Sequence, residues 1–243
     1  MPVAGVSHYH AAGAANMKSN RPCWGLLRRR ECLVPTGKGW TGLAVLFLAL
    51  LLAAIRGVHP FLAVNEPLEN GMLVVEGWLP DAGMRMAVAE FGRNHYKNVF
   101  VTGGPITTGG FLSEYQTAAQ LGAATLRRLG LSNEVVQAVP TPAVLQDRTY
   151  ASALALRKWL EQHGLHPAGL NVISYGPHGR RTRLLFEKAM GSRVKIGIIA
   201  VQVEDYDPQH WWASSQGFRT VTGETIAYLY ARCVFWNPRA PSP

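Results

Sequence analysis

The sequence predicts an α/β fold: a three-layer, Rossmann-like domain with a mostly parallel five-stranded sheet, preceded by one transmembrane helix. From residue 71 onward, short apolar runs alternate with amphipathic stretches that are long enough for helices. The runs are continuously apolar, which is typical of strands that are covered on both faces. The alternation of strands and helices favours a parallel sheet with right-handed crossovers.

Strands are expected at residues 72–75, 98–102, 135–139, 170–174 and 194–201, and helices at residues 82–96, 113–129, 148–163, 179–190 and 217–235. Ser113 with Gln116 fits a capping box at the start of the second helix. Asp147 is expected to cap the third helix. At least one of Trp211 and Trp212 is expected in the core.

The apolar run Gly39–Ile55 contains no charged residue and no proline. At roughly 1.5 Å per residue it spans about 26 Å, and its flanks extend it to a transmembrane helix at residues 39–57. Basic residues precede the run and only Arg56 follows closely, so the positive-inside rule places the amino terminus in the cytoplasm. We therefore expect a single-pass protein of the bacterial inner (plasma) membrane, with its main domain outside the cytoplasm. A cleaved signal peptide is the alternative, although residues 55–60 offer a poor cleavage site.

The chain is expected to divide into four segments: a largely disordered basic tail at 1–38, the transmembrane helix at 39–57, the α/β domain at 70–236 and a loose tail at 237–243. An arginine cluster at residues 28–30 fits a role in topology and contact with anionic lipid. Met17, followed by Lys18, is an alternative start of the protein.

Charge is distributed unevenly along the 243 residues. The formal net charge is +9, from 24 Lys and Arg against 15 Asp and Glu, and 48% of the residues are hydrophobic. Residues 1–56 hold seven of the basic residues and one acidic residue, so the remainder carries a net charge of only +3. This composition excludes a disordered polar chain, and the small excess in the domain argues against a nucleic-acid partner. The three cysteines fit neither a disulfide framework nor a zinc site.

Candidate site residues follow the strands, because open parallel sheets bind ligands outside the carboxyl ends of their strands. Glu76 follows the first strand, close to Trp78. A charged side chain at this position is unusual, which suggests a functional role. Gly103 and Gly104 leave the second strand, where they either let the backbone approach an anion or form a tight turn. Glu114, in the first turn of the helix expected at residues 113–129, is either favoured there by the helix dipole or serves as a base or metal ligand.

A basic cluster follows the fourth strand. Arginines at a helix start oppose the helix dipole and need a negative partner, and their planar forks match phosphate oxygens. We therefore expect Arg180 and Arg181 to bind phosphate, with His178 as the general acid for a leaving group. A solvated basic helix end is the alternative. Arg148 either adds a second phosphate contact or pairs locally with Asp147.

An acidic loop follows the fifth strand, with Glu204, Asp205 and Asp207 close together. Its oxygens either bind Mg²⁺ or Ca²⁺ or are solvated. No metal ligand is assigned on this basis, and the cofactor stays open, with a divalent metal as one option.

Four motifs occur in order along residues 70–232: T-G-G-P after a strand, S-E opening a helix, R-T-Y-A-S-A opening another helix, and S-Y-G-P-H-G-R-R after a further strand. In this order they resemble the YdcF/SanA/ElyC-like family, a group of bacterial envelope-associated proteins. The resemblance implies site roles for the glycine pair and for four further residues that match the family motifs: Glu114, Thr149, His178 and Arg181.

The chain also departs from the family pattern, because Ala151 and Ser152 stand where the family usually has Glu-Asn. The resemblance implies a link to the metabolism of cell-wall and surface-polymer precursors, and one branch of the family is reported to bind S-adenosylmethionine. Whether the missing pair leaves an enzyme or a protein that only binds is left open.

The lead hypothesis is a membrane-anchored protein that binds or hydrolyses a phosphorylated envelope intermediate, such as a lipid-linked precursor. Gly103, Gly104, His178 and Arg181 would hold the phosphate, and Glu76 or Glu114 would be the base. A non-catalytic ligand-binding or envelope assembly factor is the alternative, with a nucleotide or S-adenosylmethionine as a candidate ligand. The sequence lacks a dinucleotide-binding glycine motif after the first strand, a nucleophile elbow and a Walker loop.

Overall fold

The structure, a computed structural model, describes residues 34–235. The predicted loose tail at 237–243 and most of the predicted basic tail, including the arginine cluster at 28–30, lie outside the described residues. Residues 48–235 form one compact unit.

Five parallel strands form one sheet in the order β3-β2-β1-β4-β5. The strands are β1 (Met72–Glu76), β2 (Val99–Gly103), β3 (Val136–Pro140), β4 (Gly169–Tyr175) and β5 (Lys195–Val201). The chain runs outward from β1 through β2 to β3, then returns to β4 on the other side of β1 and continues to β5. The point where the strand order reverses therefore lies between β1 and β4, which is where doubly wound sheets bind ligands.

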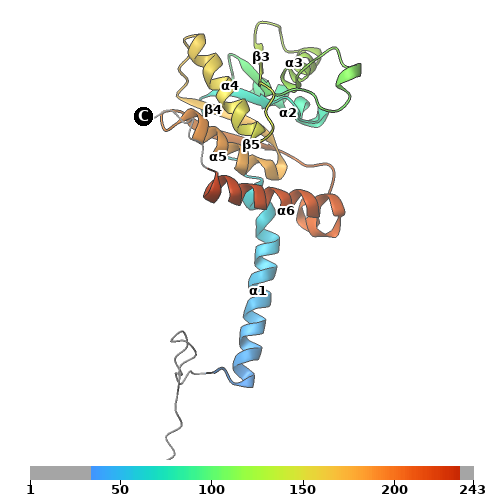
Figure 1. Cartoon of the computed structure of the whole chain (residues 1–243), viewed down its shortest axis with the longest axis vertical. Helices are drawn as coiled ribbons and strands as arrows, with labels where there is room; N and C mark the ends of the chain where they lie inside the picture. The colour runs from blue at the N-terminus through green and yellow to red at the C-terminus, as the bar shows by residue number, and fades with distance from the viewer. Residues whose placement is uncertain (1–33, 236–243) are drawn as a thin grey trace, which may run out of the picture. The chain divides into compact units, whose positions relative to one another are not determined.

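Helices cover both faces of the sheet (Figure 1). One face packs against α2 (Asp81–Arg93) and α3 (Ala118–Arg128), and the other against α4 (Arg148–Gln162) and α5 (Gly179–Met190). This arrangement confirms the predicted three-layer α/β fold with a parallel five-stranded sheet. The predicted strands and helices are all present, with boundaries that differ by a few residues.

The two sheet faces have separate cores. On β1, Leu73 and Val75 pack toward α2 and α3, whereas Val74 packs toward α4 and α5. Because side chains alternate along a strand, Glu76 faces α4 and α5. The last residue of the central strand is thus a carboxylate on a face that is otherwise apolar.

The start of α3 differs from the prediction of a capping box at Ser113. The cap is Thr117, whose hydroxyl accepts from the Gln120 amide at 3.2 Å while the Gln120 side chain accepts from the Thr117 amide at 3.1 Å. Ser113 instead accepts from the amide of Tyr115, two residues on. Residues 113–116 therefore form the loop that leads into the helix.

The expectation that the Asp147 side chain caps α4 is also wrong. Asp147 has a left-handed backbone (φ 56°), and its side chain makes no capping hydrogen bond. The first-turn amides of α4 thus lack the side-chain acceptor that helix starts usually carry.

The apolar helix α1 (Gly37–Leu62) is longer than the predicted span of 39–57. It has 26 residues and is long and apolar enough to cross a membrane, by length and composition. Its carboxyl end belongs to the compact unit: Leu62 is fully buried, and Trp211 Nε1 donates to the Ile55 carbonyl at 3.0 Å. Trp211 is 6% exposed, which confirms that at least one of the two neighbouring tryptophans is in the core.

The residues between α1 and β1 also pack on the domain, ahead of its predicted start at residue 70. Glu66 forms an isolated antiparallel bridge with Ile198 of β5. The buried Asn171 side chain on β4 accepts from the Leu68 amide at 2.7 Å and donates to the Leu68 carbonyl at 2.9 Å. The linker is therefore held along the edge and one end of the sheet.

The chain beyond β5 supplies a helical layer at the base of the domain. A 3₁₀ segment, η4 (Pro208–Ala213), leads to α6 (Ser215–Leu229), which ends in a π-helical turn, η5 (Tyr230–Val234). Val221 of α6 packs with Trp211 and with Leu62 at the end of α1.

Candidate functional site

Three neighbouring strands end in buried polar side chains on the face that α4 and α5 cover. They are Thr102 on β2, Glu76 on β1 and Ser174 on β4, and they are 1%, 3% and 0% exposed. Glu76 pairs with Thr102 in the sheet register, and Ser174 Oγ donates to Glu76 Oε2 at 2.6 Å. Polar groups buried in a core are costly unless they are paired, so a row of three at the point where the strand order reverses marks a site.

Glu76 is held by two hydroxyls from different elements. Besides Ser174, Thr182 Oγ1 on α5 donates to Glu76 Oε1 at 3.4 Å, and the two hydroxyl oxygens lie 3.2 Å apart. Thr182 is fully buried. The Thr102 hydroxyl, in contrast, is buried and has no hydrogen-bond partner among residues 34–235.

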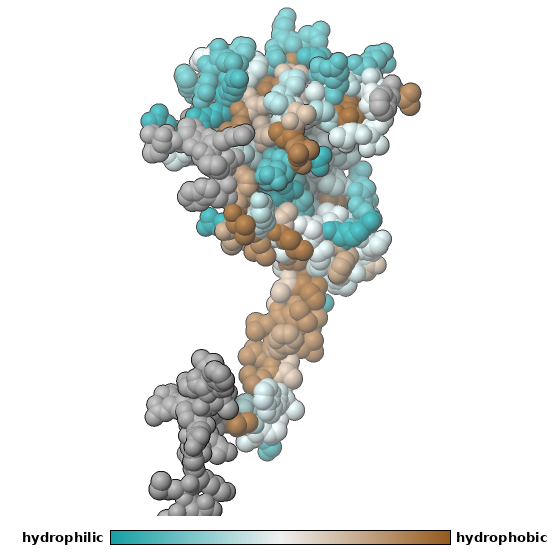
Figure 2. Space-filling view, in the orientation of Figure 1, coloured by the Kyte–Doolittle hydropathy of each residue, from teal (hydrophilic) through white to brown (hydrophobic). Residues whose placement is uncertain are grey.

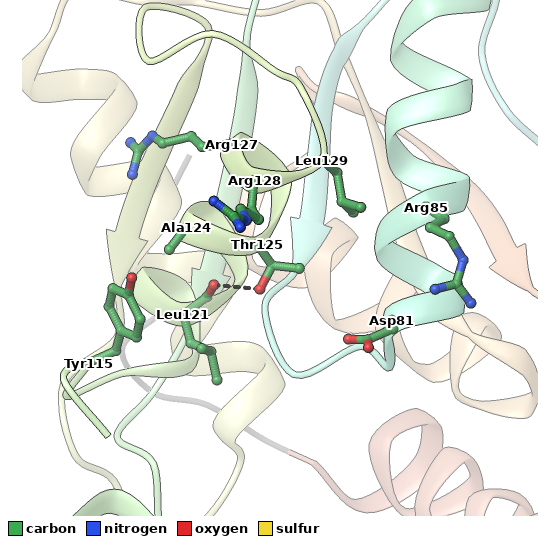
Figure 3. A pocket seen from close by; sticks show the side chains of 9 residues that line it. All are labelled: Asp81, Arg85, Tyr115, Leu121, Ala124, Thr125, Arg127, Arg128 and Leu129. Carbon is green, nitrogen blue, oxygen red and sulfur yellow. Dashed lines mark hydrogen bonds between the residues drawn. The ribbon is translucent and has the colours of Figure 1, made fainter. Parts of the chain in front are cut away.

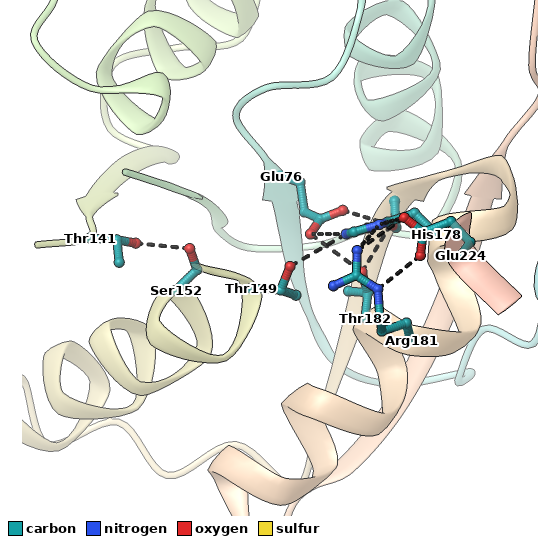
Figure 4. A network of polar contacts seen from close by, with 9 residues as sticks. Glu76, Thr141, Thr149, Ser152, His178, Arg181, Thr182 and Glu224 are labelled. Atoms are coloured by element: carbon teal, nitrogen blue, oxygen red, sulfur yellow. Dashed lines mark hydrogen bonds and ion pairs between the residues drawn. The ribbon is translucent and has the colours of Figure 1, made fainter. Parts of the chain in front are cut away.

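His178 lies between two carboxylates (Figure 4). Its Nδ1 is 2.9 Å from Glu224 Oε1 on α6, and its Nε2 is 3.6 Å from Glu76 Oε1. The same Nε2 is 3.4 Å from the hydroxyl of Thr149, in the first turn of α4. The imidazole therefore connects Glu76, in the row of buried polar side chains at the strand ends, to Thr149 at the start of α4.

Arg181 completes the network from one turn further along α5. Its Nε donates to Glu224 Oε2 at 2.8 Å and its Nη2 to Glu224 Oε1 at 3.0 Å, which is a bidentate pair. We call Glu76, His178, Arg181 and Glu224 the switch-point network. Their side chains are 5%, 12%, 20% and 17% exposed, so the network lies just below the surface.

The sharp turn after β4 places His178 at the network. Gly176 has φ 42°, a conformation that favours glycine, and a side chain there would run into Val203. Gly176–His178 forms a short 3₁₀ turn that leads directly into α5. Residues 178, 181 and 182 then fall on the side of the helix start that faces the ends of β1 and β4.

Electrostatics favour a charged imidazole. Burial disfavours the imidazolium, but the charge of Glu76 and the hydrogen bond to Glu224 outweigh it and raise the pKa of His178 to about 9. Burial also disfavours a charged Glu224, yet hydrogen bonds from His178 and Arg181 lower the pKa of Glu224 to about 2. At neutral pH the site therefore holds a protonated histidine.

The position of the Nδ1 proton sets the hydrogen bonding around Arg181. Arg181 Nη2 lies 2.8 Å from the same Nδ1 that lies near Glu224. When Nδ1 is protonated, it donates to Glu224 and cannot accept a hydrogen bond from Arg181. When Nδ1 is deprotonated, it accepts from Arg181. Loss of the proton thus exchanges one contact for the other within the network.

Trp78 flanks the imidazole on its open side. The two rings meet edge to face, with centroids 5.1 Å apart and an interplanar angle of 86°. Trp78 is 47% exposed. An exposed aromatic ring beside a buried charged group is a surface on which a ligand can pack.

The structure brings together four of the residues proposed from the sequence: Glu76, Thr149, His178 and Arg181. Arg148, next to Thr149, is exposed, and no ion pair of its side chain is found within residues 34–235. Of the two options for Arg148, the local pair with Asp147 is therefore not formed.

Two other arginines of the basic cluster lie in different contacts. Arg180 donates to the Phe61 carbonyl and stacks over the Phe61 ring, at 3.9 Å from its centroid. Arg183, its neighbour in the basic cluster, pairs with Glu66 and Glu187. Each arginine of the cluster thus has an acceptor in the protein, so the cluster is not a set of unpaired phosphate ligands.

Gly103 and Gly104 differ from each other. A Cβ on Gly103 would lie 2.9 Å from both the Ala118 side chain and the Ala119 amide nitrogen, so this glycine allows α3 to pack closely on β2. A Cβ on Gly104 would meet only the Thr141 carbonyl, at 3.9 Å. The close approach at Gly103 is therefore to the protein's own helix.

Glu114 lies apart from the switch-point network, in the exposed loop before α3, where it lines a hollow of about 400 Å³. A further hollow of about 680 Å³ lies over α2 and α3 (Figure 3). The larger hollow is lined by Asp81, Arg85, Tyr115, Leu121, Ala124, Thr125, Arg127, Arg128 and Leu129. Its charged groups lie around an open surface, with no buried acid or base between them, so we place the chemistry at the network.

Four residues of the site are absent from the sequence-based proposals: Thr102, Ser174, Thr182 and Glu224. The sequence contains one indication of a role for Glu224, because it is the only acidic residue in the α6 sequence. Its contact with His178 crosses 46 positions and depends on how α6 returns to the domain.

The acidic loop after β5 uses its carboxylates locally. Asp205 accepts from the Tyr175 hydroxyl at 2.8 Å, and Asp207 accepts from the Gln209 amide at 2.8 Å. Within residues 34–235, no group of three or more His, Cys, Asp or Glu side chains is arranged to hold a metal ion.

No protein-family model matches the chain, and no curated protein matches it. The resemblance to the YdcF/SanA/ElyC-like family therefore remains a prediction that rests on the four motifs.

Proposed function

We propose that this chain is a membrane-anchored hydrolase of a phosphorylated envelope intermediate, with His178 as the group that protonates the leaving oxygen. One observation carries the proposal. His178 lies between the carboxylates of Glu76 and Glu224, which raise its pKa, while its Nε2 also faces Thr149 at the start of a helix. The motifs that resemble the YdcF/SanA/ElyC-like family support a substrate from surface-polymer or peptidoglycan synthesis.

The start of α4 is the proposed position of the phosphoryl group. Its first-turn amides receive no cap from the Asp147 side chain, and a helix start carries a partial positive charge that attracts anions. The Thr149 hydroxyl is within the same turn, and the exposed Arg148 adds a positive charge beside it. Together with the imidazolium, these groups suit an anion bound outside the strand ends.

In the proposed step, water attacks phosphorus and the bond between phosphorus and the leaving oxygen breaks. That oxygen takes the proton from His178 Nε2, and the proton lost by the attacking water passes to solvent. His178 then regains a proton from solvent, so one water is consumed per turnover and the protein is unchanged. An acid with a pKa above neutrality is protonated at the start of every cycle.

Glu76, Glu224 and Arg181 act through His178 in this proposal. Glu76 is buried beside His178 Nε2 and already accepts from Ser174 and Thr182, so we assign it the role of a positioning residue. Glu224 accepts from the protonated Nδ1 of His178, and Arg181 holds Glu224 in place through their bidentate pair. This assignment replaces the hypothesis that Glu76 or Glu114 acts as the base.

A non-catalytic binding protein is the second candidate, favoured by the two positions that lack the family's Glu-Asn pair. Ser152 accepts a hydrogen bond from Thr141 at 2.9 Å and takes no part in the network contacts. The network would then bind the phosphoryl group without cleaving it.

Phosphate release from a panel of lipid-linked and nucleotide diphosphates separates these candidates. The full chain in phospholipid vesicles is assayed with and without Mg²⁺, as wild type, His178→Gln and the matched control His163→Gln on an exposed helix end. Turnover by wild type and control, with a loss of at least about 100-fold in His178→Gln, supports the hydrolase. Saturable binding without turnover identifies the binding protein, and neither binding nor turnover contradicts both.

The proposed topology places the amino terminus in the cytoplasm and the α/β domain outside it, at the bacterial inner membrane. The support is α1 together with the basic residues that precede it in the sequence. A reporter fused to the carboxyl terminus is expected to be active only in the form that works outside the cytoplasm. Activity of a cytoplasm-specific reporter at the same position contradicts this topology.

A further inference from the structure

One side of α6 and the turn after it exposes a row of large apolar side chains. Phe218, Ile226, Leu229, Tyr230 and Val234 are 53%, 69%, 53%, 46% and 66% exposed. We call them the apolar face of α6. Large exposed apolar rows are uncommon on soluble surfaces and mark contact with a partner.

The opposite side of α6 packs on the domain and carries a residue of the site. Gly217, Val221 and Ala231 are buried there, and Glu224 points to His178. At 100° per residue, Ile226 and Leu229 lie 200° and 140° around the helix from Glu224. The apolar face therefore points away from the switch-point network.

The apolar face lies where α1 enters the domain. The rings of Phe61 on α1 and Tyr228 on α6 meet edge to face, with centroids 5.6 Å apart. Ile55 and Val58 of α1 pack against the same cluster as Val221 of α6. In Figure 1, α6 crosses the carboxyl end of α1, and in Figure 2 brown side chains gather at that end of the domain.

The charges around the apolar face suit a membrane surface. Arg56 is the first charged residue after the apolar run of α1, and it lies over the Trp212 ring at 6.0 Å from the centroid. Arg219 and Arg232 are exposed along α6 and η5, and the one acidic residue of α6 is paired with Arg181. Arginine and tryptophan beside exposed apolar side chains match the headgroup region of a bilayer with anionic lipid.

We propose that the apolar face of α6 lies in the headgroup region of the bilayer that α1 crosses. This inference rests on the membrane anchoring in the proposed function. The bilayer is the occupant that the structure favours, because the apolar run of α1 ends at the level of α6 and brings the lipid surface to it. A second copy of the chain would need a further interface, whereas the bilayer is continuous with α1.

This placement brings the site close to lipid headgroups. α6 presents Glu224 to the network on one side and Ile226 to the membrane on the other, so one helix, about 10 Å across, separates the two. A phosphoryl group attached to a membrane lipid could then reach the start of α4 while its lipid chain stays in the bilayer. The substrate class favoured by this geometry is a lipid-linked phosphate or diphosphate.

Spin labels test the inference in the full chain, with Cys23, Cys32 and Cys233 replaced by serine. Single labels are placed through Ile226→Cys on the apolar face, Leu48→Cys in α1 and Arg128→Cys on α3 as the exposed control. The protein is reconstituted in vesicles of phosphatidylcholine and phosphatidylglycerol. The collision rates of each label with oxygen, which concentrates in lipid, and with a water-soluble nickel chelate are measured.

At position 226 we expect the ratio of oxygen to nickel collisions to exceed that at position 128 by at least about fivefold. Equal ratios at 226 and 128, with a lipid-exposed label at 48, overturn the inference and leave the anchor intact. A water-exposed label at 48 contradicts the anchor itself. Spin–spin broadening at 226 that disappears on dilution with unlabelled protein shows a second copy on the face and also overturns the inference.

Discussion

The charge of His178 is central to the proposed reaction and contributes to the stability of the fold. Its imidazole is buried between Glu76 and Glu224, so the protonated form is favoured in the folded chain and not in the unfolded one. A group with a raised pKa stabilises the fold below its ordinary pKa of 6.5 and loses that contribution as the pH rises through about 9.

We predict that the free energy of unfolding falls by about 1–3 kcal/mol between pH 6.5 and pH 9.5 because His178 loses its proton. In His178→Gln this decrease should be absent, whereas the exposed control His163→Gln should keep it. Denaturant unfolding at a series of pH values measures the change, and NMR of the ring gives the pKa directly. A His178 pKa near 6.5 contradicts the proposed charge state.

The next test removes the Glu76 carboxylate, which faces His178 Nε2. Glu76→Gln keeps a side chain of similar shape that can accept from Ser174 but removes the charge that faces His178 Nε2. We expect the pKa of His178 to fall and the free energy of unfolding at pH 6 to decrease by about 1–3 kcal/mol.

Glu187→Gln is the matched control, because Glu187 is exposed and, among the described residues, pairs only with Arg183 on the same helix. It should change the free energy of unfolding by less than about 0.5 kcal/mol. Equal effects of the two variants, with an unchanged His178 titration, would show that Glu76 does not hold the imidazole.

The positions at which the helices around the site begin are only partly predictable from the local sequence. Ser113 with Gln116 and Thr117 with Gln120 present the same capping pattern, four residues apart. The structure uses the second pair, because the chain from Gly104 onward pairs with Thr117 before the helix begins: Pro105 bridges Thr117, and the Ala118 amide donates to the Gly104 carbonyl. Tertiary pairing thus decides between two equal local signals.

The two candidate caps should differ in their effect on stability. Thr117→Ala removes the hydroxyl that accepts from the Gln120 amide and should lower the free energy of unfolding by about 1 kcal/mol. Ser113→Ala lies in the preceding loop and should lower it by less. Thermal and denaturant unfolding of the two variants measure this order, and the reverse order contradicts the cap at Thr117.

The glycine pair at the end of β2 provides a test of how closely α3 packs on β2. Gly103→Ala should lower the free energy of unfolding by about 1–3 kcal/mol, because the new Cβ meets the backbone of α3 at 2.9 Å. Gly92→Ala, where nothing lies within 4 Å, should not lower it. If Gly103→Ala abolishes ligand binding while leaving stability unchanged, the glycine serves the ligand and the packing explanation is wrong.

The switch-point network is formed by residues that lie far apart in the sequence and meet only in the folded chain. The sequence therefore predicts the fold better than it predicts the network. Continuous apolar runs are local, so β1 to β5 and the helices between them follow from their residues. The partners of the basic cluster are not local: Glu66 and Phe61 belong to the linker and to the end of α1, which the sequence places outside the domain. Glu224 likewise reaches His178 only after α6 has packed back on α5.

Glu76, Thr149, His178 and Arg181 could be selected from the sequence because each follows a strand or opens a helix. What periodicity could not show is that Arg181 and His178 share a carboxylate on another element. The arginines at the start of α5 did need negative or carbonyl partners, and the fold supplies these itself.

A titration of the full chain with inorganic pyrophosphate, followed by NMR of labelled histidine rings, addresses the proposed site. We expect a saturable shift of the His178 ring signals with an increase in the His178 pKa and unchanged His163 signals. The response should be lost when Thr149→Ala is combined with Arg148→Ala. Arg93→Ala, an exposed arginine on α2, should leave the response intact. An unchanged His178 signal at saturating pyrophosphate, or a response that survives the Thr149 and Arg148 changes, would contradict a phosphoryl site at the start of α4.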